Sequence, residues 1–444
     1  MLLRFVVRNF LSIAEELELN LFPYTRIQNM KDHIYETPEV DLLKCAAIYG
    51  ANGSGKSNLV KAAALLKAFV TNSEKHLDRI RLEGFRLDRT LHAEPSVFEI
   101  EFVTNGHYFL YTASLRVNQV VAEALYQTYP NKGTETLLFE RTEEGARLGD
   151  QYLQTAEQQT RATIYTEELL KPNESLLSLL AVAEGYSAIK EAIAWIQTSL
   201  IIINPNDFLH KRLSFAMGHD EIAQFSNKLI KMLDTGISSM FLEKKSYHTL
   251  FGLDEPAREQ AIRSRIATQK DNFTFTQLNG QDVIVQLEDG QLETYRLAAQ
   301  HQDIDGEKVT FYPEEESDGT KRVLDFLVLW HSLLKENITV IIDEIGRSLH
   351  PNLLEQLVRF FMTSKSKGQL IFTTHEANLL QQDLFRRDEV WLMEKTNKGS
   401  SKITPLSDFK IRNYLDVRKG YLNGRFGGVP NLRHLFPEDF ATHE

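Results

Sequence analysis

The segment whose residue types and spacing most directly predict chemistry is GANGSGKS, Gly50–Ser57. It fits the pattern G-x-x-x-x-G-K-[ST] and follows an apolar run ending at Gly50, while helical apolar spacing begins at Lys56. Glycines let the backbone fold around phosphate oxygens with its N–H groups pointing inward, and a helix N-terminus adds a positive dipole end. The motif predicts a nucleotide-binding loop. Its predicted binding residues are Gly50, Asn52, Gly53, Ser54, Gly55, Lys56, Ser57 and Asn58.

Two side chains of this loop have specific predicted roles. Lys56 would reach the β- and γ-phosphates of ATP, and the hydroxyl of Ser57 would bind Mg²⁺. The alternative is a glycine-rich turn between a strand and a helix that binds no ligand. The Lys-Ser pair in this strand-loop-helix context favours the phosphate loop.

A second group of polar residues follows two apolar runs late in the chain. In TVIIDEI, Asp343 is predicted to hold Mg²⁺ through its water shell, and Glu344 to polarise the attacking water as a general base. In IFTTHE, His375 ends the next apolar run, where an imidazole could contact the γ-phosphate. Taken singly, the acidic pair could cap a turn and His375 could be an ordinary polar strand end. Beside the phosphate loop, Glu344, His375 and Lys56 are the predicted catalytic residues.

The remaining sequence predicts the elements that position these groups. Alternating apolar and polar residues, or short continuous apolar runs, predict strands. The predicted strand segments are 2–13, 15–22, 44–50, 96–127 with a tight turn at Asn105-Gly106, 243–312 with turns at Asn279-Gly280 and Asp289-Gly290, 337–346 and 368–376. Apolar residues at three- and four-residue intervals predict helices over 56–70, 351–364 and most of 167–242. The apolar run Leu200–Ile203 fits a core or a subunit interface equally well. We therefore expect an α/β fold.

Composition limits the class of protein. The 444 residues are 42% hydrophobic, which is enough apolar content for a sizeable core. The formal net charge of −11 argues against a protein that coats nucleic acid non-specifically. The single cysteine, Cys45, excludes an internal disulfide framework and fits a small buried apolar residue. Because no signal peptide or membrane-spanning window is found, we expect a cytoplasmic protein with no membrane partner.

Several of these segments together resemble the SMC-like and ABC-like AAA-family ATPases of prokaryotes. That group includes the ATPase parts of OLD-family nucleases and the ATPase subunits of antiphage systems such as PARIS and Septu. The segments that carry the resemblance are VRNFLSI, GANGSGKS, FEIEF, SDGTKR, IIDEIGRSLHP, TTHE and YLNGRFGGVP. The resemblance implies an ABC/SMC-type P-loop ATPase head with a β-rich arm and a helical insertion. The expected divisions are 1–165 for the first half of the head, 166–245 for an insertion serving dimerisation or partner binding, and 246–444 for the second half.

The resemblance also implies a partner copy of the chain. Ser317 and Gly319, in SDGTK before an amphipathic helix, resemble the ABC signature, although they depart from the usual Leu-Ser-Gly-Gly-Gln. A signature of this kind binds the γ-phosphate held by the other subunit, so a head-to-tail dimer with two ATP molecules, or a larger ring, is expected. About 70 residues follow His375, too few for the Toprim nuclease domain of OLD-family proteins, so any effector is expected to be a separate protein.

The resemblance implies a regulatory ATPase subunit of an antiphage defence complex, which senses a phage component or a DNA end and controls a separate toxic effector. Two other functions remain open from the sequence. The first is a DNA-clamping ATPase of repair or chromosome maintenance, which needs a basic surface. Its candidate residues are Arg79, Arg81, Arg86 and Arg89, together with Lys410, Arg412, Arg418, Lys419 and Arg425 near the end of the chain. Charge runs of this kind are also common on ordinary solvated faces. The second is a small-substrate kinase, which would have no use for a signature acting across a dimer.

Overall fold

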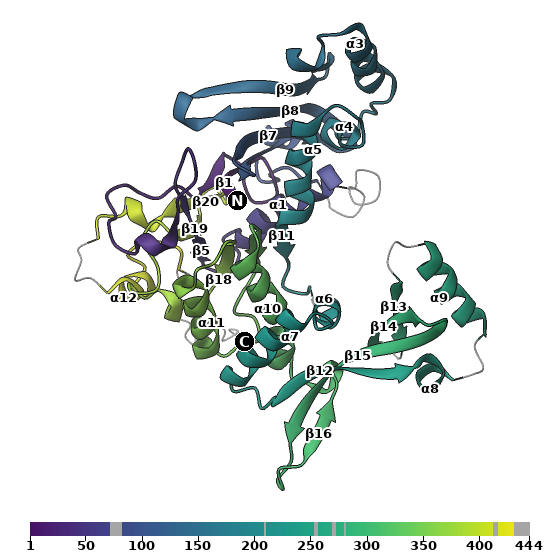
Figure 1. The fold of residues 1–444 in the computed structure, drawn as a ribbon. Helices are drawn as coiled ribbons and strands as arrows, with labels where there is room; N and C mark the ends of the chain where they lie inside the picture. Colours follow the sequence, from purple (N-terminus) through teal and green to yellow (C-terminus); the bar gives the residue numbers. More distant parts are fainter. Residues whose placement is uncertain are drawn as a thin grey trace, which may run out of the picture. The chain divides into compact units, whose positions relative to one another are not determined.

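The structure is a computed structural model that describes residues 1–71, 82–207, 210–252, 256–268, 272–278, 281–411 and 416–429. Of the residues singled out above, Arg79, Arg81, Arg412, Asn279 and Gly280 lie outside the described residues. The chain divides into two compact units, which are described separately below (Figure 1). Unit 1 comprises Met1–Pro205, Asn337–Ile345 and Lys367–Glu444, and unit 2 comprises Asn206–Glu336 and Gly346–Ser366.

The β-rich arm of unit 1 is a seven-stranded antiparallel sheet in the order β10-β9-β8-β7-β6-β1-β2. Its strands are β1 (Leu2–Arg8), β2 (Leu17–Asn20), β6 (Ser96–Thr104), β7 (His107–Arg116), β8 (Gln119–Tyr129), β9 (Thr134–Thr142) and β10 (Gly145–Leu148). The strands predicted within 2–13, 15–22 and 96–127 are all present, and β1 and β2 pair as a hairpin. Asn105 and Gly106 both have positive φ, 47° and 81°, which is the backbone that a two-residue hairpin turn requires.

The second sheet of unit 1 carries the glycine-rich loop. Its six strands are ordered β11-β17-β18-β5-β19-β20, and all neighbours are parallel except β19 and β20. They are β5 (Cys45–Gly50), β11 (Leu200–Ile203), β17 (Thr339–Ile342), β18 (Gln369–Thr374), β19 (Val390–Lys395) and β20 (Ser401–Pro405). Every residue of β5, β17 and β18 is buried, as parallel strands covered on both faces require.

Helix α1 (Lys56–Thr71) belongs to one apolar core shared by the two sheets of unit 1. Leu59, Leu66 and Phe69 of this helix are buried in the same cluster as Phe5 of β1 and Ile48 of β5. A helix with core contacts to both sheets fixes the glycine-rich loop, from which it starts, against the whole unit.

The segment 166–245 is mainly helical but contains two strands and spans both units. Its part in unit 1 holds α4 (Leu176–Ala181), α5 (Ser187–Ala194) and β11, which follow α3 (Ala156–Thr163). The apolar run Leu200–Ile203 is β11 and pairs in parallel with β17, so it lies at the edge of the loop-bearing sheet. Its part in unit 2 holds α6 (His210–Ala216), α7 (Asp220–Met232) and the first residues of β12. A role of 166–245 in dimerisation or partner binding stays a prediction.

Unit 2 combines helices with a sheet of its own, in which the described strands between residues 239 and 311 pair with one another. The strands are β12 (Ser239–Ser246), β13 (Phe273–Leu278), β14 (Gln281–Glu288), β15 (Gln291–Gln302) and β16 (Lys308–Phe311). The helices also include α8 (Tyr247–Phe251), α9 (Pro256–Thr268), α10 (Asp318–Lys335) and α11 (Pro351–Thr363). Helix α9 was not predicted, because only Ile262 and Ile266 are buried on it and its apolar stripe is narrow.

Shorter elements complete unit 1. These are β3 (Ile34–Tyr35), β4 (Leu42–Leu43), the 3₁₀ turn η8 (Ala377–Leu379) and helix α12 (Val417–Leu422). Across the described ranges, none of the helices combines the length and the apolar character needed to cross a membrane.

Candidate nucleotide-binding site

The glycine-rich loop depends on glycine at two positions for different reasons. A Cβ at Gly50 would overlap the carbonyl oxygen of Met393 on the neighbouring strand β19, so β19 packs directly against the backbone there. Gly55 has φ of 110°, a conformation that L side chains rarely adopt, and a Cβ there would overlap the side chain of Ser401. Glycine therefore permits the conformation of the loop, and close packing against Met393 and Ser401 holds it.

A chain of side-chain hydrogen bonds braces the same loop from outside. Asn58 donates to Ser12 Oγ (2.7 Å), and the hydroxyls of Ser12 and Ser401 are 2.8 Å apart. The hydroxyl of Ser401 in turn donates to the carbonyl oxygen of Ser54 (2.7 Å). Because a hydroxyl has one proton, Ser12 must donate to Ser401 in this chain. The order Asn58, Ser12, Ser401, Ser54 thus ties the start of α1 to the middle of the loop.

Lys56 is the cation of the site. Its side chain is buried, and its Nζ donates to the carbonyl oxygens of Gly50 (2.7 Å) and Ala51 (3.1 Å) and lies 3.5 Å from Nδ1 of His375. Burial lowers the pKa of Lys56 to about 8, against the opposing effect of the charges of Asp343 and Glu344. The ammonium group lies inside the loop and interacts electrostatically with the carboxylates of Asp343 and Glu344.

The two predicted acidic residues follow β17 directly. Asp343 is buried, and its carboxylate accepts a hydrogen bond from the Thr373 hydroxyl (2.6 Å) on the adjacent strand β18. The same Thr373 oxygen accepts the backbone N–H of Glu344 (2.8 Å). Glu344 has φ of 52°, an uncommon value for a residue with a side chain, and such strained positions cluster at functional sites. Thr373 therefore fixes both the Asp343 carboxylate and the turn that carries Glu344.

His375 follows β18 and completes the group. Loss of hydration, followed by the charge of Lys56, lowers the pKa of His375 below its ordinary value, so the ring is mainly neutral at pH 7. A cavity of about 330 Å³ opens at this edge of the sheet. It is lined by Asn52, Gly53, Ser54, Gly55, Lys56, Ser57, Asn58, Glu344 and His375.

The residues of this cavity fit a magnesium nucleotide. Ser54 Oγ is buried and has no hydrogen-bond partner among the described residues, so a donor beside the loop stays available. The buried Lys56 supplies a cation for phosphate oxygens. The positive φ angles of Gly53 and Gly55 let the backbone curve around those oxygens. The cavity volume lies within the range of about 300–1,000 Å³ that small-molecule sites occupy.

The signature-like residues lie in unit 2 and are described within it. Ser317 is the N-cap of α10, where its exposed hydroxyl accepts the backbone N–H of Thr320 (3.1 Å). A Cβ at Gly319 would come within 2.8 Å of the carbonyl oxygen of Ser348, so the segment after the acidic strand packs closely on the start of α10. Next to the cap, Glu316 pairs with His301 of β15 (2.7 Å). This arrangement fixes the turn that holds Ser317.

The structure thus brings together one set of predicted residues and leaves the other set in unit 2. Gly50, the loop, Lys56, Asp343, Glu344 and His375 lie together in unit 1, whereas Ser317 and Gly319 belong to unit 2. Three supporting residues were missed from the sequence, namely Ser12, Thr373 and Ser401. Ser12 and Thr373 do stand in the quoted segments VRNFLSI and TTHE, but single hydroxyl residues give no signal of their own.

Residues 45–381 match the family described as an AAA domain, AbiEii toxin, of a type IV toxin–antitoxin system, and the chain belongs to this family. With the parallel sheet, the phosphate loop and the antiparallel arm, this confirms the predicted fold, an SMC/ABC-like P-loop ATPase head. Members of this class bind nucleotide. A search of curated proteins finds no significant match.

Several solved structures are similar to this chain over most of its length. One is the SMC head domain from Thermotoga maritima, with 13% identity, a TM-score of 0.39 and coverage of 91% of this chain and 98% of that chain. Another is an Smc head domain with an extended coiled coil, bound to the C-terminal domain of ScpA, derived from Pyrococcus furiosus. It has 12% identity, a TM-score of 0.38 and coverage of 92% of this chain and 97% of that chain.

Proposed function

We propose that this chain is an Mg²⁺-dependent ATPase whose nucleotide state controls a separate toxic effector in a bacterial antiphage defence complex. The observation that carries the enzymatic part is the convergence of Lys56, Glu344 and His375 on one cavity, with Asp343 held beside them. The regulatory part is supported by the family, whose description names toxin–antitoxin systems.

The residues of the candidate site divide the chemistry among them in this proposal. The loop N–H groups and Lys56 bind the phosphates, and Ser57 and Asp343 would hold Mg²⁺, which supplies charge neutralisation at the transferred phosphoryl group. Glu344 orients and deprotonates the attacking water, and the neutral His375 donates to, or accepts from, groups at the γ-phosphate. The strained backbone at Glu344, fixed by Thr373, keeps the general base in one orientation.

Control of an effector depends on a nucleotide site that two copies of the chain complete together. Ser317 and Gly319 at the N-terminus of α10 would complete the site of a second copy, so bound ATP holds a head-to-tail dimer or larger ring closed and hydrolysis releases it. Nucleotide occupancy then shifts the equilibrium between the closed and the released oligomer, and the effector responds to that shift.

The test is ATP hydrolysis and solution mass of the purified chain and of Glu344→Gln, with Lys56→Ala as the control that loses binding. Glu344→Gln should reduce turnover by about 10²–10⁴-fold, the usual contribution of general-base catalysis, while nucleotide affinity is kept and a nucleotide-bound oligomer accumulates. Turnover at the parent rate, or a monomer at saturating ATP, would overturn the proposal.

Duplex DNA separates the proposed switch from a DNA clamp. Turnover that is indifferent to duplex DNA supports the switch. Stimulation of several-fold, together with oligomers that retain DNA, would instead assign the chain to DNA maintenance, with exposed Arg86 and Arg89 as candidate contacts.

A further inference from the structure

Unit 1 contains a second cavity, of about 420 Å³, that shares no lining residue with the nucleotide cavity. Three arginines and four carboxamides supply its polar wall, and no carboxylate is present among its described lining residues. The lining is Arg26, Ile27, Gln28, Asn29, Leu380, Gln381, Gln382, Phe385, Arg386, Arg387, Val390, Leu406 and Val417. Because Asp388 neutralises Arg386, the positive charge at this cavity comes from Arg26 and Arg387, in a chain whose net charge is −11.

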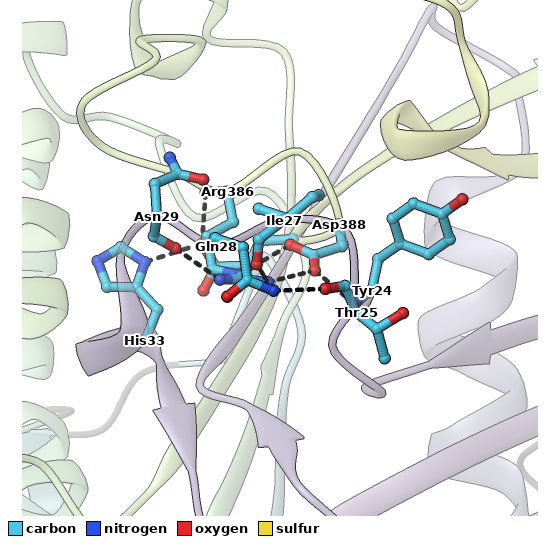
Figure 2. A network of polar contacts seen from close by, with 9 residues as sticks. Tyr24, Thr25, Ile27, Gln28, Asn29, His33, Arg386 and Asp388 are labelled. Carbon is cyan, nitrogen blue, oxygen red and sulfur yellow. Dashed lines mark hydrogen bonds and ion pairs between the residues drawn. The ribbon is translucent and has the colours of Figure 1, made fainter.

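A buried ion pair builds one wall of the cavity (Figure 2). Arg386 is fully buried and forms a two-point pair with Asp388, at 3.0 and 2.7 Å. Its other guanidinium contacts go to the carbonyl oxygens of Asn29 (2.6 Å) and Ile27 (3.3 Å), and Asp388 accepts the backbone N–H of Tyr24 (2.7 Å). A single pair thus fixes the loop 24–29, which supplies one side of the cavity.

Of the other two arginines, Arg26 is the candidate to pair with a ligand, and Arg387 contributes positive charge at the cavity wall. Arg26 is exposed, and among the residues that the structure describes no carboxylate pairs with it. Arg387 is held at the cavity wall by its hydrogen bond to the carbonyl oxygen of Ile411 (2.9 Å). Guanidinium groups bind carboxylate and phosphate with matched geometry, and carboxamides both donate and accept at the edge of a polar ring or chain. Leu406 and Val417 add an apolar surface.

We propose that this cavity binds a small anionic molecule of mononucleotide size, whose phosphate or carboxylate group pairs with Arg26 beside the positive charge of Arg387. The polar remainder of the ligand meets the carboxamide of Gln28. The volume suits such a ligand, and the fixed ion pair of Arg386 makes the loop 24–29 a preformed wall.

The cavity is connected to the nucleotide site through backbone on two sides. From Glu376 to Phe385 consecutive turns are closed by hydrogen bonds, so Leu380 and Gln381 of the cavity follow His375 through an ordered segment. On the other side, Val390 of the cavity begins β19, and Met393 of the same strand packs against Gly50. A ligand here therefore changes the affinity for ATP. This coupling rests on the proposed function, whereas binding of the anion does not.

Binding is tested by calorimetry on the full chain carrying Lys56→Ala, which disables the phosphate loop. The probes are AMP and inorganic phosphate for a phosphate group and citrate for a carboxylate. At least one probe should bind one molecule per chain, and Arg26→Glu should weaken it by about tenfold or more, because a favourable charge becomes repulsive. Arg418→Glu, an exposed arginine of α12 outside the lining, is the matched control and should leave the affinity unchanged.

Three results would overturn the proposal. They are the absence of binding by every probe, binding that persists in Arg26→Glu, and equal loss in the Arg418→Glu control. Arg26-dependent binding of a short DNA duplex, with no small probe bound, would also reject a small-molecule site.

For coupling, the affinity of the parent chain for a non-hydrolysable ATP analogue is measured with and without the bound probe. A change that disappears in Arg26→Glu supports coupling, whereas a change retained in Arg26→Glu is competition at the phosphate loop and rejects it.

Discussion

The lowered pKa of Lys56 predicts that nucleotide affinity falls as pH rises through about 8. A lysine with a pKa of about 8 is about three-quarters protonated at pH 7.5 and about one-tenth protonated at pH 9. Phosphates are almost fully ionised over this range, since their second pKa is about 6. Because the phosphates bind the protonated amine and raise its pKa, affinity is complete only well below pH 8 and falls as pH rises through 8. The expected loss between pH 7.5 and 9 is about one order of magnitude, or about 1 kcal/mol.

The measurement is the dissociation constant of a non-hydrolysable ATP analogue across this pH range. A lysine at its ordinary pKa of about 10.4 would stay almost fully protonated at pH 9 and give a flat profile. Lys56→Arg is the control, because a guanidinium remains charged throughout and should abolish the pH dependence whatever its effect on affinity. His375 does not contribute, since its pKa lies below the range. A flat profile for the parent chain, or the same slope in Lys56→Arg, would refute the reasoning.

Three further outcomes are expected. Gly55→Ala should weaken nucleotide binding by about 1–3 kcal/mol, because its φ of 110° is strained for alanine, and Ser401→Gly should recover only the part due to the overlap with Ser401. Glu123→Gln should lower the free energy of unfolding by about 1–3 kcal/mol in chemical denaturation, because the buried carboxylate accepts three hydrogen bonds from the start of α4 and one from Tyr111 of β7; unchanged stability would contradict this. A mixture of Ser317→Ala and Lys56→Ala chains should regain ATPase activity if Ser317 acts in trans, and a mixture as inactive as each variant alone would exclude that.

The sequence predicted the parts of the site that have a distinctive local pattern. The glycine-rich loop, the acidic pair after β17 and His375 after β18 were all located from motif and apolar runs, because buried parallel strands read as continuous apolar segments. The strands β11, β19 and β20 were not placed in the sheet, since strand pairing is set by contacts distant in sequence. For the same reason Ser401 was missed, because its contact with Ser54 spans 347 positions.

The two-part character of unit 2 has a consequence for protein engineering. The chain leaves unit 2 at Glu336, forms the segment Asn337–Ile345 in unit 1, and re-enters unit 2 at Gly346. The strand that carries the acidic pair is therefore a covalent bridge between two passages of unit 2. Unit 2 cannot be excised or transplanted as one cassette, because a single deletion removes Asp343 and Glu344 as well. A minimal form of unit 1 would need two separate linkers, one on each side of that strand.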